Sequence, residues 1–225
     1  MANSVIAIDG PAGSGKSTTA KLVAKKLGFL YLDTGAMYRA ITLKALENGV
    51  DVNDEEKLEK LTRDSVISFE NKDGESRIWL DGSDVSEEIR EPRVNRNVSY
   101  VSMHKKVRKV LVEKQKQIGE ENDLVAEGRD TTTVVFPHAF KVYLDADINE
   151  RAKRRLLELQ EKGIQSTLDE QVAEISRRDK LDSGREASPL FKHEDAVVVD
   201  TTGLSIEQQV DRVVQLFSQN TPRDV

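Results

Sequence analysis

Residues 10–17 read Gly-Pro-Ala-Gly-Ser-Gly-Lys-Ser and match the phosphate-binding pattern G-x-x-x-x-G-K-[ST]. Directly before them, residues 5–8 form a continuous apolar run, which is typical of a strand buried on both faces. After them, apolar side chains recur at helical spacing and end at Gly28, a common helix stop. Because a strand, a glycine-rich loop and a helix follow one another, the pattern predicts a P-loop rather than an ordinary glycine turn.

The predicted loop has the residue types that binding of a nucleoside triphosphate requires. Its glycines allow the backbone to turn its N–H groups inward, and the helix N-terminus adds partial positive charge. We expect Lys16 to reach the β- and γ-phosphates and the Ser17 hydroxyl to hold Mg²⁺. The residues expected to bind ATP are Gly10, Pro11, Ala12, Gly13, Ser14, Gly15, Lys16, Ser17 and Thr18.

The composition limits what kind of protein this is. A length of 225 residues suits one domain with a substantial core. The net charge of −6 does not favour nucleic-acid binding, and the lack of cysteine excludes disulfides, thiolate metal sites and cysteine nucleophiles. No apolar stretch has membrane-spanning length and no secretion signal is recognisable, so we expect a cytoplasmic protein that binds no membrane.

Strand-like runs and helical patterns alternate over most of the chain, which predicts an α/β fold with a parallel sheet. The further predicted strands are residues 29–32, 124–126, 140–144 and 197–199. The predicted helices are residues 34–48, residues 94–118, a segment from about residue 148, and two segments opened by capping boxes at 167–170 and 205–208.

Two short β-like runs interrupt this alternation, at residues 65–70 and 76–80, with a turn at residues 71–74 between them. They predict a small antiparallel insert. From the residues alone the insert is either a surface hairpin or a mobile flap over a substrate.

A P-loop does not by itself separate kinases from GTPases and motor ATPases. Residues 200–203 fit the GTPase switch pattern, but they follow the last strand, and residues 71–74 lack the aspartate that reads guanine. Arginines are more informative, because phosphoryl transfer between two phosphate-bearing substrates needs several guanidinium groups around one cleft. Those at or near predicted strand ends and on neighbouring helices are Arg39, Arg129, Arg151, Arg155, Arg178 and Arg185. For Arg154 a solvated helix face stays an open alternative.

Four segments in this order resemble the bacterial cytidylate kinases, and the resemblance runs nearly end to end. They are residues 10–17, residues 32–39 (Leu-Asp-Thr-Gly-Ala-Met-Tyr-Arg), residues 127–130 (Glu-Gly-Arg-Asp) and residues 177–185 (Arg-Arg-Asp-Lys-Leu-Asp-Ser-Gly-Arg). The resemblance implies a P-loop fold with a five-stranded parallel sheet flanked by helices. Within a single kinase domain it implies a core formed by residues 1–60, 92–150 and 167–225, a β-rich monophosphate-binding insert at 61–91 and a lid at 151–166.

The resemblance also implies the reaction, which is transfer of the γ-phosphate of ATP, with Mg²⁺, to CMP or dCMP. Separately, we expect the protein to be a monomer that binds no nucleic acid. Cytosine is expected to be read by Ser99, Arg108 and Asp130, with Thr34 and Tyr38 close to the nucleotide. The sugar is expected at Arg178 and Asp182, and the acceptor phosphate at Arg39, Arg129 and Arg185. Lys16, Arg151 and Arg155 are expected to serve the transferring phosphoryl group.

The sequence departs from the family pattern in two places. Glu127 stands where the family usually has aspartate, and we expect it to support Mg²⁺ through water. Thr131 and Thr132 stand where an apolar residue and then glycine are usual, and Thr132 is expected to tighten the loop beside Asp130.

Two other functions stay open at this point. The first is a kinase for another small acceptor, such as AMP, UMP or shikimate, which differs only in its acceptor pocket. The second is a P-loop regulatory ATPase or a nucleotide-dependent RNA-binding protein. An RNA-binding protein predicts a basic stripe with interleaved aromatic residues, and this sequence has neither.

Overall fold

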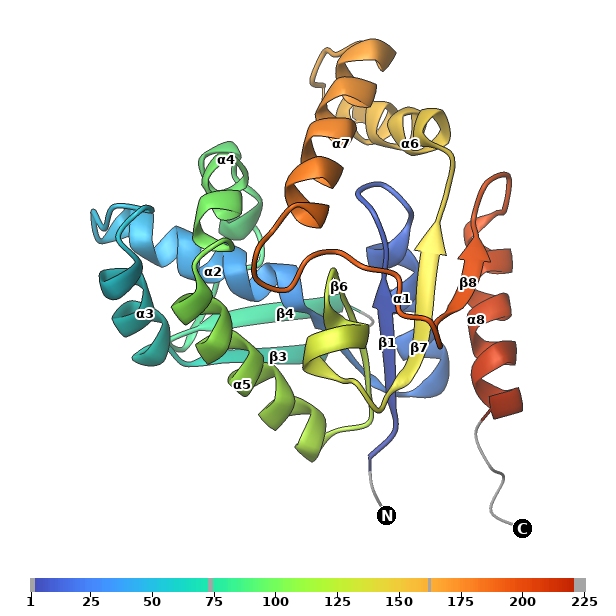
Figure 1. Ribbon diagram of the computed structural model, residues 1–225, viewed down its shortest axis with the longest axis horizontal. Helices are drawn as coiled ribbons and strands as arrows, with labels where there is room; N and C mark the ends of the chain where they lie inside the picture. The colour runs from blue at the N-terminus through green and yellow to red at the C-terminus, as the bar shows by residue number, and fades with distance from the viewer. Residues whose placement is uncertain (1–2, 73–74, 162, 221–225) are drawn as a thin grey trace. The chain divides into compact units, whose positions relative to one another are not determined.

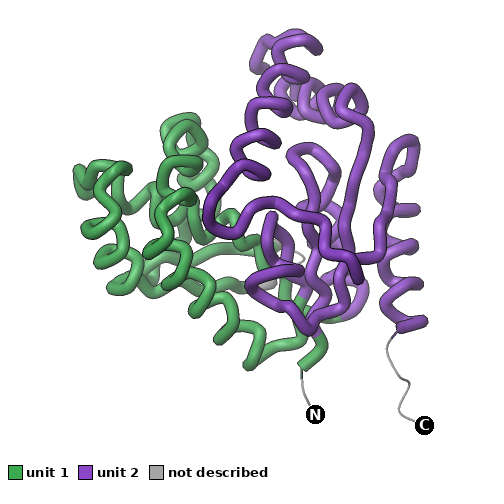
Figure 2. The backbone as a smooth tube through the Cα atoms, in the orientation of Figure 1, with its two compact units in different colours: residues 1–4, 28–124 green, residues 5–27, 125–225 purple. Residues whose placement is uncertain are grey.

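The computed structural model describes residues 3–72, 75–161 and 163–220 of the chain. The chain forms two compact units, shown in separate colours in Figure 2. Unit 1 consists of Met1–Ser4 and Gly28–Leu124, and unit 2 of Val5–Leu27 and Val125–Val225. In the part of the chain that the structure describes, no helix is both long and apolar enough to cross a membrane.

The main sheet has five strands in the order β2-β6-β1-β7-β8 (Figure 1). They are β1 (Val5–Asp9), β2 (Leu30–Asp33), β6 (Leu124–Gly128), β7 (Phe140–Asp145) and β8 (Val197–Asp200). β1 pairs in parallel with β7, and β7 pairs in parallel with β8. Residues Ile6, Ala7 and Ile8 of β1 are fully buried, as expected for a strand covered on both faces. The predicted α/β class with a five-stranded parallel sheet is confirmed.

Unit 2 contains the helices α1 (Lys16–Leu27), α6 (Ile148–Glu161), α7 (Leu168–Ser183) and α8 (Ile206–Asn220). Both predicted capping boxes are present. The Thr167 N–H donates to the Glu170 carboxylate at 2.8 Å, and the Glu170 N–H donates to the Thr167 hydroxyl at 3.3 Å. In the same way, the Ser205 N–H donates to the Gln208 side-chain oxygen at 2.9 Å, and the Gln208 N–H donates to the Ser205 hydroxyl at 3.2 Å. α6 packs against α7, and α8 packs against α1. A π-helical turn, η2 (Thr131–Val135), was not predicted from the sequence.

Unit 1 contains α2 (Thr34–Glu47), α3 (Glu55–Arg63), the short η1 (Glu88–Arg90), α4 (Pro92–Val101) and α5 (Lys105–Glu121). The prediction of one helix over residues 94–118 was wrong, because the chain breaks between α4 and α5. His104 has extended backbone angles, and its ring nitrogen Nε2 lies 2.8 Å from the carbonyl oxygen of Val52. A tertiary contact therefore separates α4 from α5. The helix α3 was also not predicted from the sequence.

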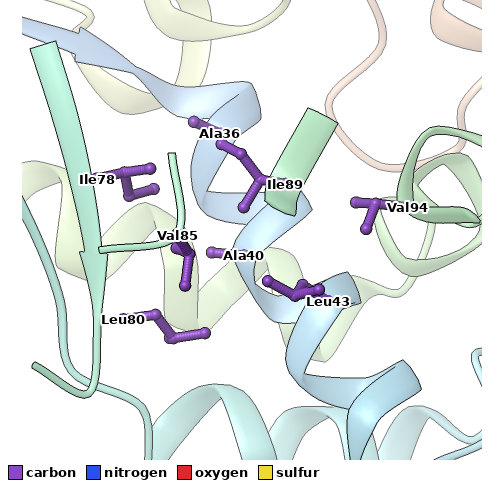
Figure 3. Close-up of a cluster of buried hydrophobic side chains, with 8 residues drawn as sticks. All are labelled: Ala36, Ala40, Leu43, Ile78, Leu80, Val85, Ile89 and Val94. Atoms are coloured by element: carbon purple, nitrogen blue, oxygen red, sulfur yellow. The ribbon is translucent and has the colours of Figure 1, made fainter. Parts of the chain in front are cut away.

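The insert is a three-stranded antiparallel sheet of β3 (Ile67–Lys72), β4 (Glu75–Leu80) and β5 (Ser83–Asp84). The predicted turn at 71–74 lies partly outside the described residues, since residues 73–74 are not described. Side chains of the insert share one hydrophobic cluster with α2 (Figure 3). The cluster consists of Ala36, Ala40, Leu43, Ile78, Leu80, Val85, Ile89 and Val94. The insert is therefore packed on a helix of unit 1 and shares its hydrophobic core, and the choice between a surface hairpin and a mobile flap stays open.

We expect Ile78→Ala to lower the free energy of unfolding by about 2–5 kcal/mol, because it removes a buried side chain from the shared cluster. Ile78 is only 3% exposed. Urea unfolding measures the loss, and Val66→Ala is the control because Val66 is 68% exposed. Equal losses in the two variants would show that the insert does not share a core with α2.

Candidate active site

The P-loop connects β1 to α1 and has the backbone that the glycines predict. A Cβ atom at Gly10 would overlap the carbonyl oxygen of Leu144 on β7, so only glycine fits there. Gly13 has a φ of 77°, in the left-handed region that favours glycine. The loop therefore lies against the carboxyl end of β7 and has the curled backbone that phosphate binding requires.

Lys16 is buried at the start of α1, with 5% of its surface exposed. Its Nζ donates to the carbonyl oxygen of Pro11 at 2.8 Å. Burial and the nearby Arg129 guanidinium lower the pKa of Lys16 to about 7. The amine is thus costly to charge in this environment, and a bound phosphate would favour its charged form.

Ser17 and Glu127 form a pair of oxygen groups beside the loop. The Ser17 hydroxyl donates to Oε1 of Glu127 at 2.6 Å, and Glu127 is buried at the end of β6. Among the described residues no group of three or more acidic or histidine side chains is placed to hold a metal ion. One hydroxyl and one carboxylate suit Mg²⁺, which takes oxygen ligands and usually retains waters and substrate phosphates as its other ligands. The residues present fit the expected ion.

Two of the predicted acceptor-phosphate residues, Arg129 and Arg185, lie in one ion-paired cluster with Asp182, which was predicted for the sugar. Arg129 donates from Nε to Asp182 Oδ2 at 2.7 Å, and Arg185 binds the other oxygen of the same carboxylate. Burial favours a raised pKa for Asp182, but the Arg129 and Arg185 guanidinium groups outweigh it and hold the pKa below its usual range. The positive charge of Arg178 also acts on Asp182 and on Lys16. The structure therefore brings Arg129, Arg185 and Asp182 into direct contact, and their roles in substrate binding stay predictions.

Arg151 on α6 contacts the P-loop directly. Its guanidinium donates to the Ala12 carbonyl oxygen at 3.0 Å and to Asp179 Oδ2 at 2.6 Å. The other oxygen of Asp179 accepts the Ala12 backbone N–H at 3.1 Å. Asp179 was missed by the sequence analysis, although it lies between Arg178 and Asp182 in the motif at residues 177–185. Its carboxylate accepts a hydrogen bond from a P-loop N–H group, and such N–H groups bind phosphate oxygens when a nucleotide is present.

Arg154 and Arg155 have different surroundings. Arg154 donates to the backbone oxygen of Thr201 at 2.7 Å and to that of Ser14 at 3.4 Å, so the solvated-face alternative for Arg154 was wrong. Arg155 is 47% exposed and pairs with Glu158 at 2.7 Å. The structure does not bring Arg155 to the P-loop, and its predicted role stays a prediction.

Unit 1 holds the other predicted substrate residues. The Arg108 guanidinium lies over the Tyr38 ring, 5.3 Å from its centroid, and donates to the Ser102 oxygen at 3.1 Å. Both side chains are buried. Ser99 is half-buried on α4, the helix that ends just before Ser102. These three residues therefore belong to one region of unit 1.

Arg39 and Thr34 lie in the first turns of α2. Arg39 pairs with Asp33 at 2.6 Å, and Asp33 also caps the helix by accepting the Ala36 N–H at 2.8 Å. The Arg39 Nε is buried and has no hydrogen-bond partner among the described residues. A buried guanidinium N–H at a helix N-terminus suits an anionic ligand.

We expect Asp179→Asn to strengthen binding of a non-hydrolysable ATP analogue severalfold, because the carboxylate competes for the Ala12 N–H and repels phosphate. Titration calorimetry measures the dissociation constant. Asp169→Asn removes an exposed charge from the same helix and is the control. If both variants bind the analogue equally well, Asp179 does not compete with the nucleotide.

Comparisons with known proteins show the family of this chain. The family model described as "Cytidylate kinase" matches residues 6–219. The cytidylate kinase of Caldanaerobacter subterraneus subsp. tengcongensis is 52% identical over 221 residues, covering 98% of this chain and 97% of that protein. The cytidylate kinase of Enterococcus faecalis is 50% identical over 215 residues, covering 95% of each. A solved structure of an uncharacterized protein from Eubacterium ventriosum, with a TM-score of 0.56 and 10% identity, covers 97% of this chain and all of that one and shares the fold. The P-loop, the arginine cluster and these relatives together show that the chain belongs to the cytidylate kinase family.

Proposed function

We propose that this protein transfers the γ-phosphate of ATP to CMP or dCMP and forms ADP with CDP or dCDP. The observation that carries the proposal lies within unit 2. A P-loop with its lysine and a separate cluster of arginines around Asp182 occur in the same unit. A kinase for a nucleoside monophosphate needs both, because each of its two substrates brings phosphate.

The donor is assigned to residues 10–18. The loop N–H groups bind the phosphates, and Lys16 leaves the Pro11 oxygen to pair with the β- and γ-phosphates. Mg²⁺ is assigned to Ser17 and, through water, to Glu127, and when bound it neutralises charge on the phosphate oxygens. Arg151 supports the transferring group from α6, where it already contacts Ala12.

The acceptor phosphate is assigned to Arg39, Arg129 and Arg185. A guanidinium has five N–H donors, so Arg129 retains donors for phosphate while its Nε remains bound to Asp182. Asp182 fixes the orientation of Arg129 and Arg185, and with Arg178 it is assigned to the sugar hydroxyls. Orientation matters because phosphoryl transfer depends mostly on positioning and on positive charge.

The base is assigned to Ser99, Arg108 and Asp130, with Tyr38 and Thr34 beside the nucleotide. Cytosine has an amino donor at N4 and acceptors at N3 and O2, whereas uracil has an acceptor at O4 and a donor at N3. A carboxylate only accepts and a guanidinium only donates. Asp130 at N4 and Arg108 toward N3 and O2 therefore match cytosine and oppose uracil.

Four further assignments stay predictions. They are a lid at residues 151–166 that includes Arg155, a monophosphate-binding insert at 61–91, a monomeric state and a cytoplasmic location.

An acceptor panel tests the proposed function. ADP formation is measured with ATP and Mg²⁺ in the presence of CMP, dCMP, UMP, AMP or shikimate. We expect kcat/KM for CMP to exceed that for UMP by about a hundredfold or more, since two mismatched contacts each cost roughly 1–3 kcal/mol. Preference for another acceptor, or ADP formation that needs no acceptor, would overturn the proposal in favour of a different kinase or a regulatory ATPase.

We expect Asp130→Asn to narrow the preference for CMP over UMP, because an amide can also donate to O4 of uracil. The variant is compared with the wild type in the same kinetic assay, with both acceptors. If the substitution lowers kcat/KM equally for CMP and UMP, Asp130 does not read the base and instead orients its neighbour Arg129.

A further inference from the structure

Asp9, the last residue of β1, has a fully buried carboxylate. Its Oδ1 accepts the backbone N–H of Thr131 at 3.0 Å and the Thr131 hydroxyl at 2.6 Å. Its Oδ2 accepts the backbone N–H of Thr132 at 2.8 Å and the Thr132 hydroxyl at 2.7 Å. Asp9, Thr131 and Thr132 are called the aspartate–threonine clamp below.

In the clamp, each oxygen of the Asp9 carboxylate accepts two hydrogen bonds, one from a backbone N–H and one from a hydroxyl. Burial raises the pKa of Asp9, and the hydrogen bonds from both threonines oppose that rise. The two backbone donors are the first N–H groups of η2, which no earlier turn of that helix can satisfy. Thr131 and Thr132 are as buried as Asp9, at 0% and 1% exposure, so water does not compete for these bonds.

Both ends of the clamp lie next to site residues. Asp9 directly precedes Gly10, where the P-loop begins. Thr131 directly follows Asp130, whose carbonyl oxygen accepts the backbone N–H of Val134 at 2.9 Å in the same helical turn. The clamp therefore connects the end of β1, where the P-loop begins, to the residue assigned to the cytosine amino group.

The threonine side chains supply part of the clamp directly. A glycine at position 132 would keep its backbone N–H but have no hydroxyl, and an apolar residue at 131 would lose the other hydroxyl. In this chain each hydroxyl binds one oxygen of Asp9. Half of the bonds in the clamp thus depend on the two threonine hydroxyls.

We propose that Asp9, Thr131 and Thr132 are positioning residues for acceptor recognition, which hold Asp130 in place for the base of the nucleoside monophosphate. The proposal rests on the proposed function, because it takes Asp130 as the group that reads cytosine. The three residues act through Asp130 and do not touch the substrate. A displacement of about 1 Å at such a group lowers turnover by up to about a hundredfold.

The test compares Thr131→Val/Thr132→Val, which removes both hydroxyls and keeps the side-chain shape, with Thr131→Ser/Thr132→Ser, which keeps both hydroxyls. Thr62→Val is the stability control, because Thr62 is a fully buried threonine of α3 whose hydroxyl bonds the Leu58 oxygen at 2.6 Å. The measurements are kcat/KM for CMP and for UMP, the dissociation constant of a non-hydrolysable ATP analogue, and the melting temperature. Thr132→Gly replaces the valine variant if that protein does not fold.

We expect the valine variant to lose about tenfold to a hundredfold in kcat/KM for CMP and less for UMP, with unchanged affinity for the ATP analogue. The serine variant should keep the wild-type preference for CMP over UMP. Thr62→Val should lower the melting temperature and leave the kinetics unchanged. Unchanged kinetics in the valine variant, or equal losses for CMP and UMP, would overturn the proposal and leave the clamp a purely structural contact.

A wild-type protein that prefers another acceptor would contradict the proposed function. In that case the clamp is tested on the preferred acceptor, and it stands only if kcat/KM for that acceptor falls in the valine variant but not in the serine variant.

Discussion

The shape of the P-loop depends on cationic side chains that bind its carbonyl oxygens. Lys16, Arg151 and Arg154 donate to the backbone oxygens of Pro11, Ala12 and Ser14. A loop whose carbonyl groups are held in this way can direct its N–H groups toward a phosphate. The loop therefore depends on α6 as well as on its own glycines, which explains how the sequence pattern becomes a defined structure.

Paired carboxylates make this amount of positive charge compatible with folding. Removing one partner of a buried ion pair leaves an uncompensated charge and lowers the stability of a protein by about 3–5 kcal/mol. Asp182 pairs with Arg129 and Arg185, Asp179 pairs with Arg151, and in unit 1 Asp33 pairs with Arg39. Because guanidinium groups have more donors than one carboxylate can accept, the arginines stay oriented and still have N–H groups for phosphate.

In several places the two oxygens of one carboxylate bind different groups, and these groups include backbone N–H groups and side chains of the proposed site. The two oxygens of Asp33 are divided between the N-cap of α2 and Arg39. Those of Asp179 are divided between Ala12 and Arg151, and those of Asp9 between the first two residues of η2. Asp9 and Asp33 end strands and Asp179 lies within α7, and each of these carboxylates contacts residues with a proposed role.

The sequence alone determined what depends on local patterns. The apolar runs predicted the strands of the parallel sheet, the capping boxes at Thr167 and Ser205 predicted the starts of α7 and α8, and the motif at 10–17 predicted the P-loop. The side chain at each of these positions acts on backbone within a few residues of it, so the sequence carries the signal directly.

Only the tertiary structure decided the features that depend on partners far along the chain. The break between α4 and α5 depends on the contact of His104 with Val52, and η2 depends on Asp9, more than 100 positions earlier. Asp179 reaches Ala12 across 167 positions, and Arg154, for which the sequence left a solvated face open, binds Thr201. Buried polar groups take whichever partner the fold brings within hydrogen-bond distance, and a one-dimensional pattern does not contain that distance.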